Sequence, residues 1–165
     1  MPILIRDMRL EDARAFLEIH HAAVRGLAPK DYSPDVIDAW APMPILDEHV
    51  EKVRSNPDGE MRLIAERDGR IVGIGCLIAG NGELRACYVS PEASRRGVGS
   101  AIVGAIESAA REQGVAHLDV DSSVTAEPFY AVLGYKARER SEHILPNGLR
   151  MACVKMRKRL QAPTR

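Results

Sequence analysis

Two arginines and two glycines stand together at the start of an apolar, periodic segment in the middle of the chain. Arg95 and Arg96 precede Gly97 and Gly99 in the stretch SRRGVGS. A helix N-terminus exposes backbone N–H groups and carries partial positive charge. Glycine lets a ligand approach the backbone, and guanidinium groups bind phosphate through paired hydrogen bonds. The combination predicts an anion-binding loop that suits a diphosphate.

Two other phosphate-binding motifs do not fit this loop. A P-loop places a lysine directly after its last glycine, and no lysine follows a glycine in this stretch. The dinucleotide motif G-x-G-x-x-G would need a third glycine where Ile102 stands. A nucleotide-binding domain is therefore disfavoured. A helix start with solvated arginines is the alternative to a diphosphate site.

Periodicity predicts the elements that position the loop. Helical spacing of apolar residues favours helices over 10–24, 32–40, 46–56, 97–113 and 125–134. Ser33 before Pro34 is typical of a helix start, and Asp47 is the expected cap of the next helix. Stretches of β-forming residues predict strands over 2–10, 61–67, 70–79, 84–89, 116–121, 135–140 and 148–160.

Two turn dipeptides organise the central strands. Asp68-Gly69 and Asn81-Gly82 each stand between β-forming stretches and predict two-residue hairpin turns, hence a three-stranded antiparallel meander. The remaining helices and strands alternate on either side of this meander. The order predicts an α/β fold with a mixed, mostly antiparallel sheet and helices on both faces.

Composition limits the classes of protein to consider. With 165 residues the chain is long enough for one domain with a substantial core. Its 23 lysines and arginines balance its 23 aspartates and glutamates, which argues against a general nucleic-acid binder. Because the sequence lacks a signal-peptide pattern and a membrane-spanning apolar stretch, we expect a cytoplasmic protein without a membrane partner.

Cysteine and histidine usage gives no sign of a disulfide or a metal site. Cys76, Cys87 and Cys153 are odd in number and far apart, and the sequence lacks C-x-x-C and H-x-x-x-H. We expect inert, reduced thiols. His20 and His21 are neighbours that a helix would direct about 100° apart, so no metal is expected.

Together with a second segment, the loop resembles the motifs of the GNAT superfamily of N-acetyltransferases. That family carries Q/R-x-x-G-x-G/A after a strand and N-x-x-A-x-x-x-Y-x-x-x-G-[FY] further along. The matching residues are Gly97, Val98 and Gly99 in the first motif and Ala126, Tyr130, Gly134 and Tyr135 in the second. Ser94 replaces the Q/R residue, and Ser123 replaces the asparagine. The resemblance implies a single domain over 1–165 with a core of about 3–160 and a twisted sheet of about six to seven strands.

The resemblance also implies acetyl-CoA as acyl donor. In the family the pyrophosphate lies on the glycine loop, and the pantetheine arm pairs like an added strand with the backbone of the preceding strand. The residues this implies for acetyl-CoA are Arg95, Arg96, Gly97, Val98, Gly99 and Ser100 at the phosphates, Cys87, Tyr88 and Val89 along the arm, and Ser123, Ala126, Phe129 and Tyr130 beside it.

The family transfers acetyl to a primary amine by direct attack, and the resemblance gives Tyr130 the role of general acid toward the leaving thiolate. Packing beside Phe129 is the alternative role for this tyrosine. The base is left open: Glu83 is the named candidate, and His117, Asp119, Asp121 and water are the others.

The acceptor is expected to be an amine on a small molecule or peptide. Tyr32 and Trp40 are candidates for its lining, although core packing also suits the only tryptophan. A non-catalytic acyl-CoA-binding sensor is the rival interpretation, and the tyrosine at position 130 favours the enzyme. Homodimers are common in the family, but the sequence identifies no interface.

Overall fold

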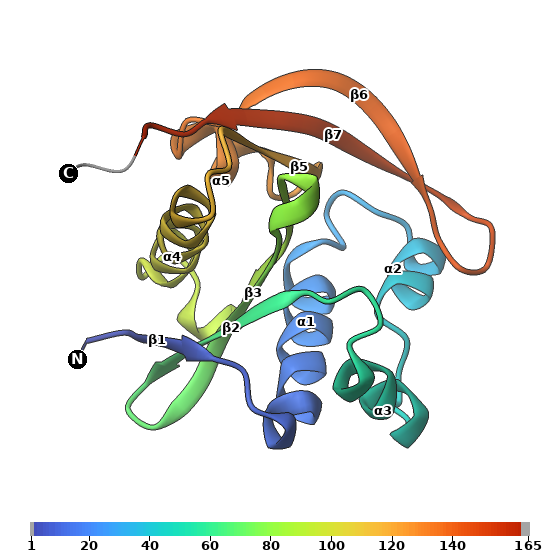
Figure 1. Cartoon of the computed structure of the whole chain (residues 1–165). Coiled ribbons are helices and arrows are strands. Elements are labelled where there is room, and N and C mark those ends of the chain that lie inside the picture. Colours follow the sequence, from blue (N-terminus) through green and yellow to red (C-terminus); the bar gives the residue numbers. More distant parts are fainter. Residues whose placement is uncertain (1, 163–165) are drawn as a thin grey trace.

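Seven strands form one sheet in the computed structural model, which describes residues 2–162 (Figure 1). Their order across the sheet is β1-β2-β3-β4-β5-β7-β6, and every neighbouring pair is antiparallel except β4 and β5. The strands are β1 (Leu4–Asp7), β2 (Met61–Arg67), β3 (Arg70–Ile78), β4 (Glu83–Val89), β5 (His117–Ser123), β6 (Lys136–Ile144) and β7 (Arg150–Arg159).

Helices cover both faces of the sheet, as predicted (Figure 1). The helices are α1 (Ala13–Leu27), α2 (Pro34–Trp40), α3 (Asp47–Ser55), α4 (Val98–Glu112) and α5 (Glu127–Val132), with short 3-10 turns at Leu10–Asp12, Ala79–Asn81 and Pro91–Ala93. Helix α4 packs on one face, and α1 and α3 pack on the other. No helix within residues 2–162 is long and apolar enough to cross a membrane. The predicted α/β fold class is confirmed.

Helix α4 packs closely on strand β3 at a glycine of that strand. Its apolar residues Val98, Ile102 and Ile106 are almost fully buried. A Cβ atom on Gly73 of β3 would stand 2.7 Å from Cδ1 of Ile102, closer than side chains tolerate. The missing side chain on β3 therefore lets α4 settle on the sheet and fixes where its N-terminus points.

The predicted capping residue is correct for α2 and wrong for α3. Ser33 caps α2 by accepting a hydrogen bond from the N–H of Val36, as expected. The prediction that Asp47 caps α3 was wrong: Leu46 holds the cap position, and its N–H donates to Nδ1 of His49 at 3.1 Å. The imidazole thus accepts from the N–H of the cap residue, and no side chain of the described residues caps the N–H groups of the first turn.

Of the two predicted hairpin turns, one has the expected form and the other does not. Asp68 and Gly69 both have positive φ, 54° and 74°, as the predicted two-residue turn requires. The prediction for Asn81-Gly82 was wrong, because Ala79–Asn81 form a 3-10 turn and only Gly82 is left-handed. The longer turn brings the carbonyl of Gly82 to the N–H of Asp119 at 2.8 Å, which ties the start of β4 to β5.

Strands β4 and β5 separate almost immediately after this junction. Glu83 opposite Asp119 is their only paired position. On its other edge β4 stays paired with β3, although Arg85 is an extra, unpaired residue between Leu84 and Ala86. From Cys87 to Val89 the edge of β4 that faces β5 is therefore open, in the middle of the sheet.

Two histidines lie on α1 beside this region, His20 half-buried and His21 buried. The ring of His20 lies 4.4 Å from the ring of Tyr88 on β4, and its Nε2 is buried without a hydrogen-bond partner. Burial lowers the pKa of His20 to about 3. Burial also lowers the pKa of His21, whose Nδ1 has no partner.

These histidines should make the fold acid-sensitive. An unfolded histidine binds a proton near pH 6.5, so between about pH 6.5 and 3 the unfolded chain holds more protons than the native one. The free energy of unfolding should therefore fall as pH falls through this window. His20→Phe should reduce that slope by up to about 1.4 kcal/mol per pH unit, measured by urea unfolding from pH 7 to 4. The control His117→Gln, at an exposed histidine, should keep the slope; an unchanged slope in His20→Phe would contradict the assignment.

Candidate active site

A cavity of about 470 Å³ lies beside the N-terminus of α4. Helix α1 supplies an apolar wall that includes Ala23, Val24 and Leu27. Sequence-predicted residues that line it are Cys87, Tyr88, Val89, Arg95, Gly97, Gly99, Ser100, Ser123, Ala126 and Phe129. The open edge of β4 and the glycine loop thus border the same space, which we call the first cavity.

The loop presents backbone donors to the first cavity. Gly97 holds the N-cap position of α4 with φ 83°, and no side chain caps the helix. The first intrahelical bond runs from the N–H of Ala101 to the carbonyl of Gly97, so the preceding N–H groups lack an acceptor within the helix. Two of their residues, Gly99 and Ser100, line the cavity. The arrangement can bind an anion.

The two arginines of the loop are placed differently. Arg95 has φ 61° and lines the first cavity. Arg96 is not part of its lining, and its carbonyl accepts a hydrogen bond from Nη2 of Arg67 at 3.2 Å. The side chain of Val98 is 1% exposed and belongs to the core, so this residue could contribute only its backbone.

Gly99 is the point where α4 meets α5. A Cβ atom there would lie 2.9 Å from two ring atoms of Phe129 and 3.6 Å from Cγ2 of Val89. The carbonyl of Gly99 also accepts a weak hydrogen bond from the Cys87 thiol at 3.8 Å. A side chain at position 99 would therefore displace groups that line the first cavity.

A second cavity, of about 380 Å³, lies across the separated strands. It shares five lining residues with the first cavity: Trp40, Cys87, Tyr88, Ser123 and Ala126. Other lining residues are Glu83, Arg85 and Ala86 of β4, Val120, Asp121 and Ser122 of β5, Tyr130 of α5, and His143, Met151 and Cys153 of the last two strands. The two cavities thus meet at the open edge of β4.

Tyr130 lines the second cavity, and its neighbour Phe129 lines the first. Tyr130 is 4% exposed, and its ring packs edge-on against Phe129 at 5.0 Å and Tyr135 at 5.6 Å. Its hydroxyl makes no hydrogen bond to any residue within 2–162. Burial raises the pKa of Tyr130 well above its ordinary value, so the phenol keeps its proton.

A buried polar cluster holds the ring of Tyr135 and so supports Tyr130. The hydroxyl of Tyr135 donates to Oε2 of Glu107 on α4 at 2.8 Å. Lys158 of β7 contacts both carboxylate oxygens of Glu107 at 3.0 Å. The cluster ties α4, β7 and the end of α5 together behind the candidate acid.

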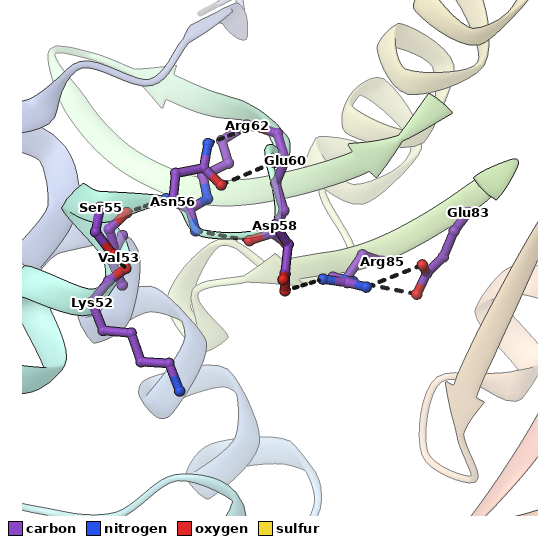
Figure 2. A network of polar contacts seen from close by, with 9 residues as sticks. All are labelled: Lys52, Val53, Ser55, Asn56, Asp58, Glu60, Arg62, Glu83 and Arg85. Carbon is purple, nitrogen blue, oxygen red and sulfur yellow. Dashed lines mark hydrogen bonds and ion pairs between the residues drawn. The ribbon is translucent and has the colours of Figure 1, made fainter. Parts of the chain in front are cut away.

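The candidate bases are all close to cations or away from the cavities. Glu83 lines the second cavity, but Arg85 contacts both its oxygens at 3.3 Å and also reaches Asp58 at 2.8 Å (Figure 2). Asp121 lines the same cavity and pairs with Lys155 at 3.2 Å.

The two remaining candidates on β5 do not line either cavity. Asp119 pairs with Arg157 at 2.6 Å, and this hydrogen bond lowers the pKa of its carboxyl. His117 is exposed at the start of the strand. The shared strand face that the alternation predicts therefore brings only Asp121 to the second cavity.

The two aromatic candidates for the acceptor lining have different places. Trp40 lines both cavities and packs against Tyr88 with ring centroids 6.5 Å apart. Tyr32 is not a lining residue: its hydroxyl donates to the carbonyl of Ala152 at 2.6 Å and accepts from the N–H of Val124 at 2.8 Å. It joins the segment before α2 to the residue after β5 and to β7.

Sequence reasoning missed the wall contributed by the last two strands. His143, Met151 and Cys153 line the second cavity, and Met151 and Cys153 are buried. The spacing of Met151 and Cys153, two residues apart in a β-forming stretch, would have been a usable signal for these two, because such residues share one face of a strand. The side chains of β6 are mostly exposed and give no such signal. Cys76, Cys87 and Cys153 are free thiols, and no group of His, Cys, Asp or Glu within 2–162 could hold a metal ion.

Comparisons with known proteins agree with this architecture. Residues 29–160 match the family model described as "Acetyltransferase (GNAT) domain". The protein described as "Uncharacterized N-acetyltransferase YafP" of Escherichia coli strain K12 is 32% identical over 136 residues, covering 81% of each chain.

Solved structures superpose on nearly the whole chain. A protein from Rhodopseudomonas palustris, described as "GCN5-Related N-acetyltransferase: Aminotransferase, Class-II", has a TM-score of 0.88 and 31% identity, with 97% of both chains covered. The PaiA N-acetyltransferase of Thermoplasma acidophilum, solved with coenzyme A, has a TM-score of 0.71 and 20% identity, covering 96% of this chain and 99% of that one. The chain therefore belongs to the GNAT superfamily of N-acetyltransferases.

Proposed function

We propose that this protein transfers the acetyl group of acetyl-CoA to a primary amine, as a single N-acetyltransferase domain over 1–165. The observation that carries the proposal is the meeting of two cavities at the open edge of β4, beside Cys87 and Tyr88. One cavity has the donors that a diphosphate needs, and the other has room for an acceptor. A thioester placed between them is accessible from both sides.

The first cavity suits coenzyme A. The N–H groups at 97–100 and the guanidinium of Arg95 would hold the pyrophosphate, with Arg96 and the backbone of Val98 at its edge. The pantetheine arm would extend along Cys87, Tyr88 and Val89, whose backbone groups on the β5 side lack a strand partner. Ser123, Ala126 and Phe129 would cover the arm. The T. acidophilum protein, which has the same fold, was solved with coenzyme A.

Tyr130 would protonate the sulfur as the C–S bond breaks. A free tyrosine has a pKa near 10 and a thiol near 8.5, so the donor is slightly weak in water. Burial raises the pKa of Tyr130 further. The same surroundings raise the pKa of the Cys87 thiol to about 12, and a CoA thiolate formed beside it would be desolvated in the same way. The pKa values of the acid and of the thiol that it protonates are thus raised together.

An assay for released thiol separates catalysis from binding. The protein would be incubated with acetyl-CoA and a panel of primary amines, including 2-phenylethylamine, spermidine and a short peptide with a free N-terminus. Amine-dependent thiol release with an acetylated amine detected by mass spectrometry is the expected result. Binding of acetyl-CoA without transfer to any amine would instead support an acyl-CoA-binding sensor.

Replacing Cys87 by alanine should keep most of the activity. Its thiol is a poor nucleophile because burial raises its pKa to about 12. The proposed role of this residue lies in its backbone, which the substitution keeps. Turnover within about threefold of wild type is expected; loss of activity, together with an acetylated Cys87 trapped on the reaction path, would contradict direct attack.

A further inference from the structure

The amine that enters the second cavity needs a proton acceptor. A primary ammonium group has a pKa near 10 and must lose a proton before it attacks a thioester. Among the described residues, the lining side chains that are able to accept a proton at neutral pH are Glu83, Asp121 and His143. This inference rests on the proposed function and concerns which of the three takes the proton.

The thiols and phenols of this cavity already hold protons. Burial raises the pKa of Cys87 to about 12 and raises the pKa values of Tyr88 and Cys153. Burial also keeps Tyr130 protonated, which suits an acid and not a base. These four groups are therefore not acceptors for the ammonium proton.

Both carboxylates are already engaged by cations. Arg85 contacts Oε1 and Oε2 of Glu83 at 3.3 Å through Nε and Nη2 (Figure 2). Asp121 Oδ1 accepts from Nζ of Lys155 at 3.2 Å. Protonating either carboxylate would weaken an existing ion pair and leave a cation without its partner.

His143, unlike the two carboxylates, is not paired with a cation among the described residues. It stands opposite Met151 in the pairing of β6 with β7, and directly paired residues share one face of a sheet. It lines the second cavity and makes no hydrogen bond or ion pair with any residue within 2–162. Arg150 and Glu142, the charged residues next to Met151 and His143 on the same hairpin, pair with each other at 3.5 Å. Its exposure gives an imidazolium a path to hand its proton to water.

We propose that His143 is the general base of the reaction. Its imidazole takes one proton from the ammonium group, and the free amine attacks the carbonyl carbon of the thioester to form the C–N bond. The C–S bond then breaks, and its electron pair stays on sulfur, which is protonated by Tyr130. Tyr130 recovers a proton from the acetylated nitrogen, and His143 releases its own to solvent. The sum is an amide, a free thiol and one proton.

The test is the pH profile of kcat/KM for a primary amine that the wild-type protein acetylates, with 2-phenylethylamine tried first. Wild-type activity should fall at acid pH, because a general base accepts a proton only in its unprotonated form. His143→Gln should lower the rate at pH 7 by about tenfold to a hundredfold and move the acid limb to higher pH, where the amine itself loses its proton. Added imidazole should restore part of the lost rate at pH 7.

Two control variants accompany this test. His117→Gln, at an exposed histidine outside both cavities, should keep the wild-type profile. Glu83→Gln should keep the acid limb where the wild type has it, even if KM changes. His143→Asn serves as a second substitution, and thermal unfolding checks that each variant is folded.

The outcomes distinguish a failure of the role of His143 from a failure of the proposed acetyl transfer. An unchanged acid limb in both His143 variants, or a limb that moves in Glu83→Gln instead, would overturn the role of His143 while leaving acetyl transfer intact. If the wild-type protein binds acetyl-CoA in calorimetry but acetylates no amine, the proposed function itself fails, and the base fails with it.

Discussion

Tyr130→Phe should lower the rate of acetyl transfer by roughly 10²-fold and leave the affinity for acetyl-CoA nearly unchanged. The substitution keeps the ring that packs against Phe129 and Tyr135 and removes only the hydroxyl. That hydroxyl has no partner within 2–162, so no existing hydrogen bond is lost. Single-turnover kinetics of acetyl transfer, with calorimetry for acetyl-CoA, would measure the two effects separately.

The neighbouring tyrosine provides the matched control. Tyr135→Phe also removes one buried hydroxyl, but this one donates to Glu107 at 2.8 Å. It should cost about 1–3 kcal/mol of unfolding free energy and affect turnover much less than Tyr130→Phe. If both variants lowered the rate equally, Tyr130 would act through packing. An acyl donor with a more acidic thiol should reduce the loss in Tyr130→Phe only, because its thiolate needs less protonation.

The part of the site that is local in sequence could be predicted from sequence. The glycines at 97 and 99 and the apolar residues of α4 predict a helix start with free N–H groups, and the structure has a cavity there. The spacing from Ala126 to Tyr130 is also local, since one helical turn carries both residues to the strand junction. In each case one short segment determines both the element and its direction.

The second cavity depends on pairings that no local pattern encodes. Strand β7 inserts between β5 and β6, so its neighbours in space are not in chain order. This insertion brings His143 and Met151 into the lining of the same cavity as Glu83 and Asp121.

Two further features of the site could not be predicted from sequence: the edge strand β6 and the extra residue in β4. The side chains of β6 are mostly exposed, so the strand shows no buried stripe. The extra residue Arg85 places a guanidinium beside Glu83, which changes how that carboxylate can act. Neither effect follows from residue type or spacing alone.

Gly99→Val should weaken coenzyme A binding by about 100-fold. The new Cβ would lie 2.9 Å from the ring of Phe129 and 3.6 Å from Val89, and both residues line the first cavity. The valine methyl groups would also separate the pyrophosphate from the N–H groups of the loop. Losing about two charge-assisted hydrogen bonds, each worth roughly 1.5–3 kcal/mol, corresponds to at least that factor in the dissociation constant. Isothermal titration with coenzyme A would measure it.

Gly104→Val is the matched control on the same helix. A Cβ at Gly104 meets nothing within 4 Å, and the residue is exposed away from both cavities. Valine is no worse than glycine in a helix, so this variant should keep both its stability and its affinity. Equal affinities in the two variants would contradict a phosphate site at the start of α4. A loss confined to Gly99→Val, with thermal unfolding little changed, would mean that this glycine is needed to admit the ligand and not to form the helix.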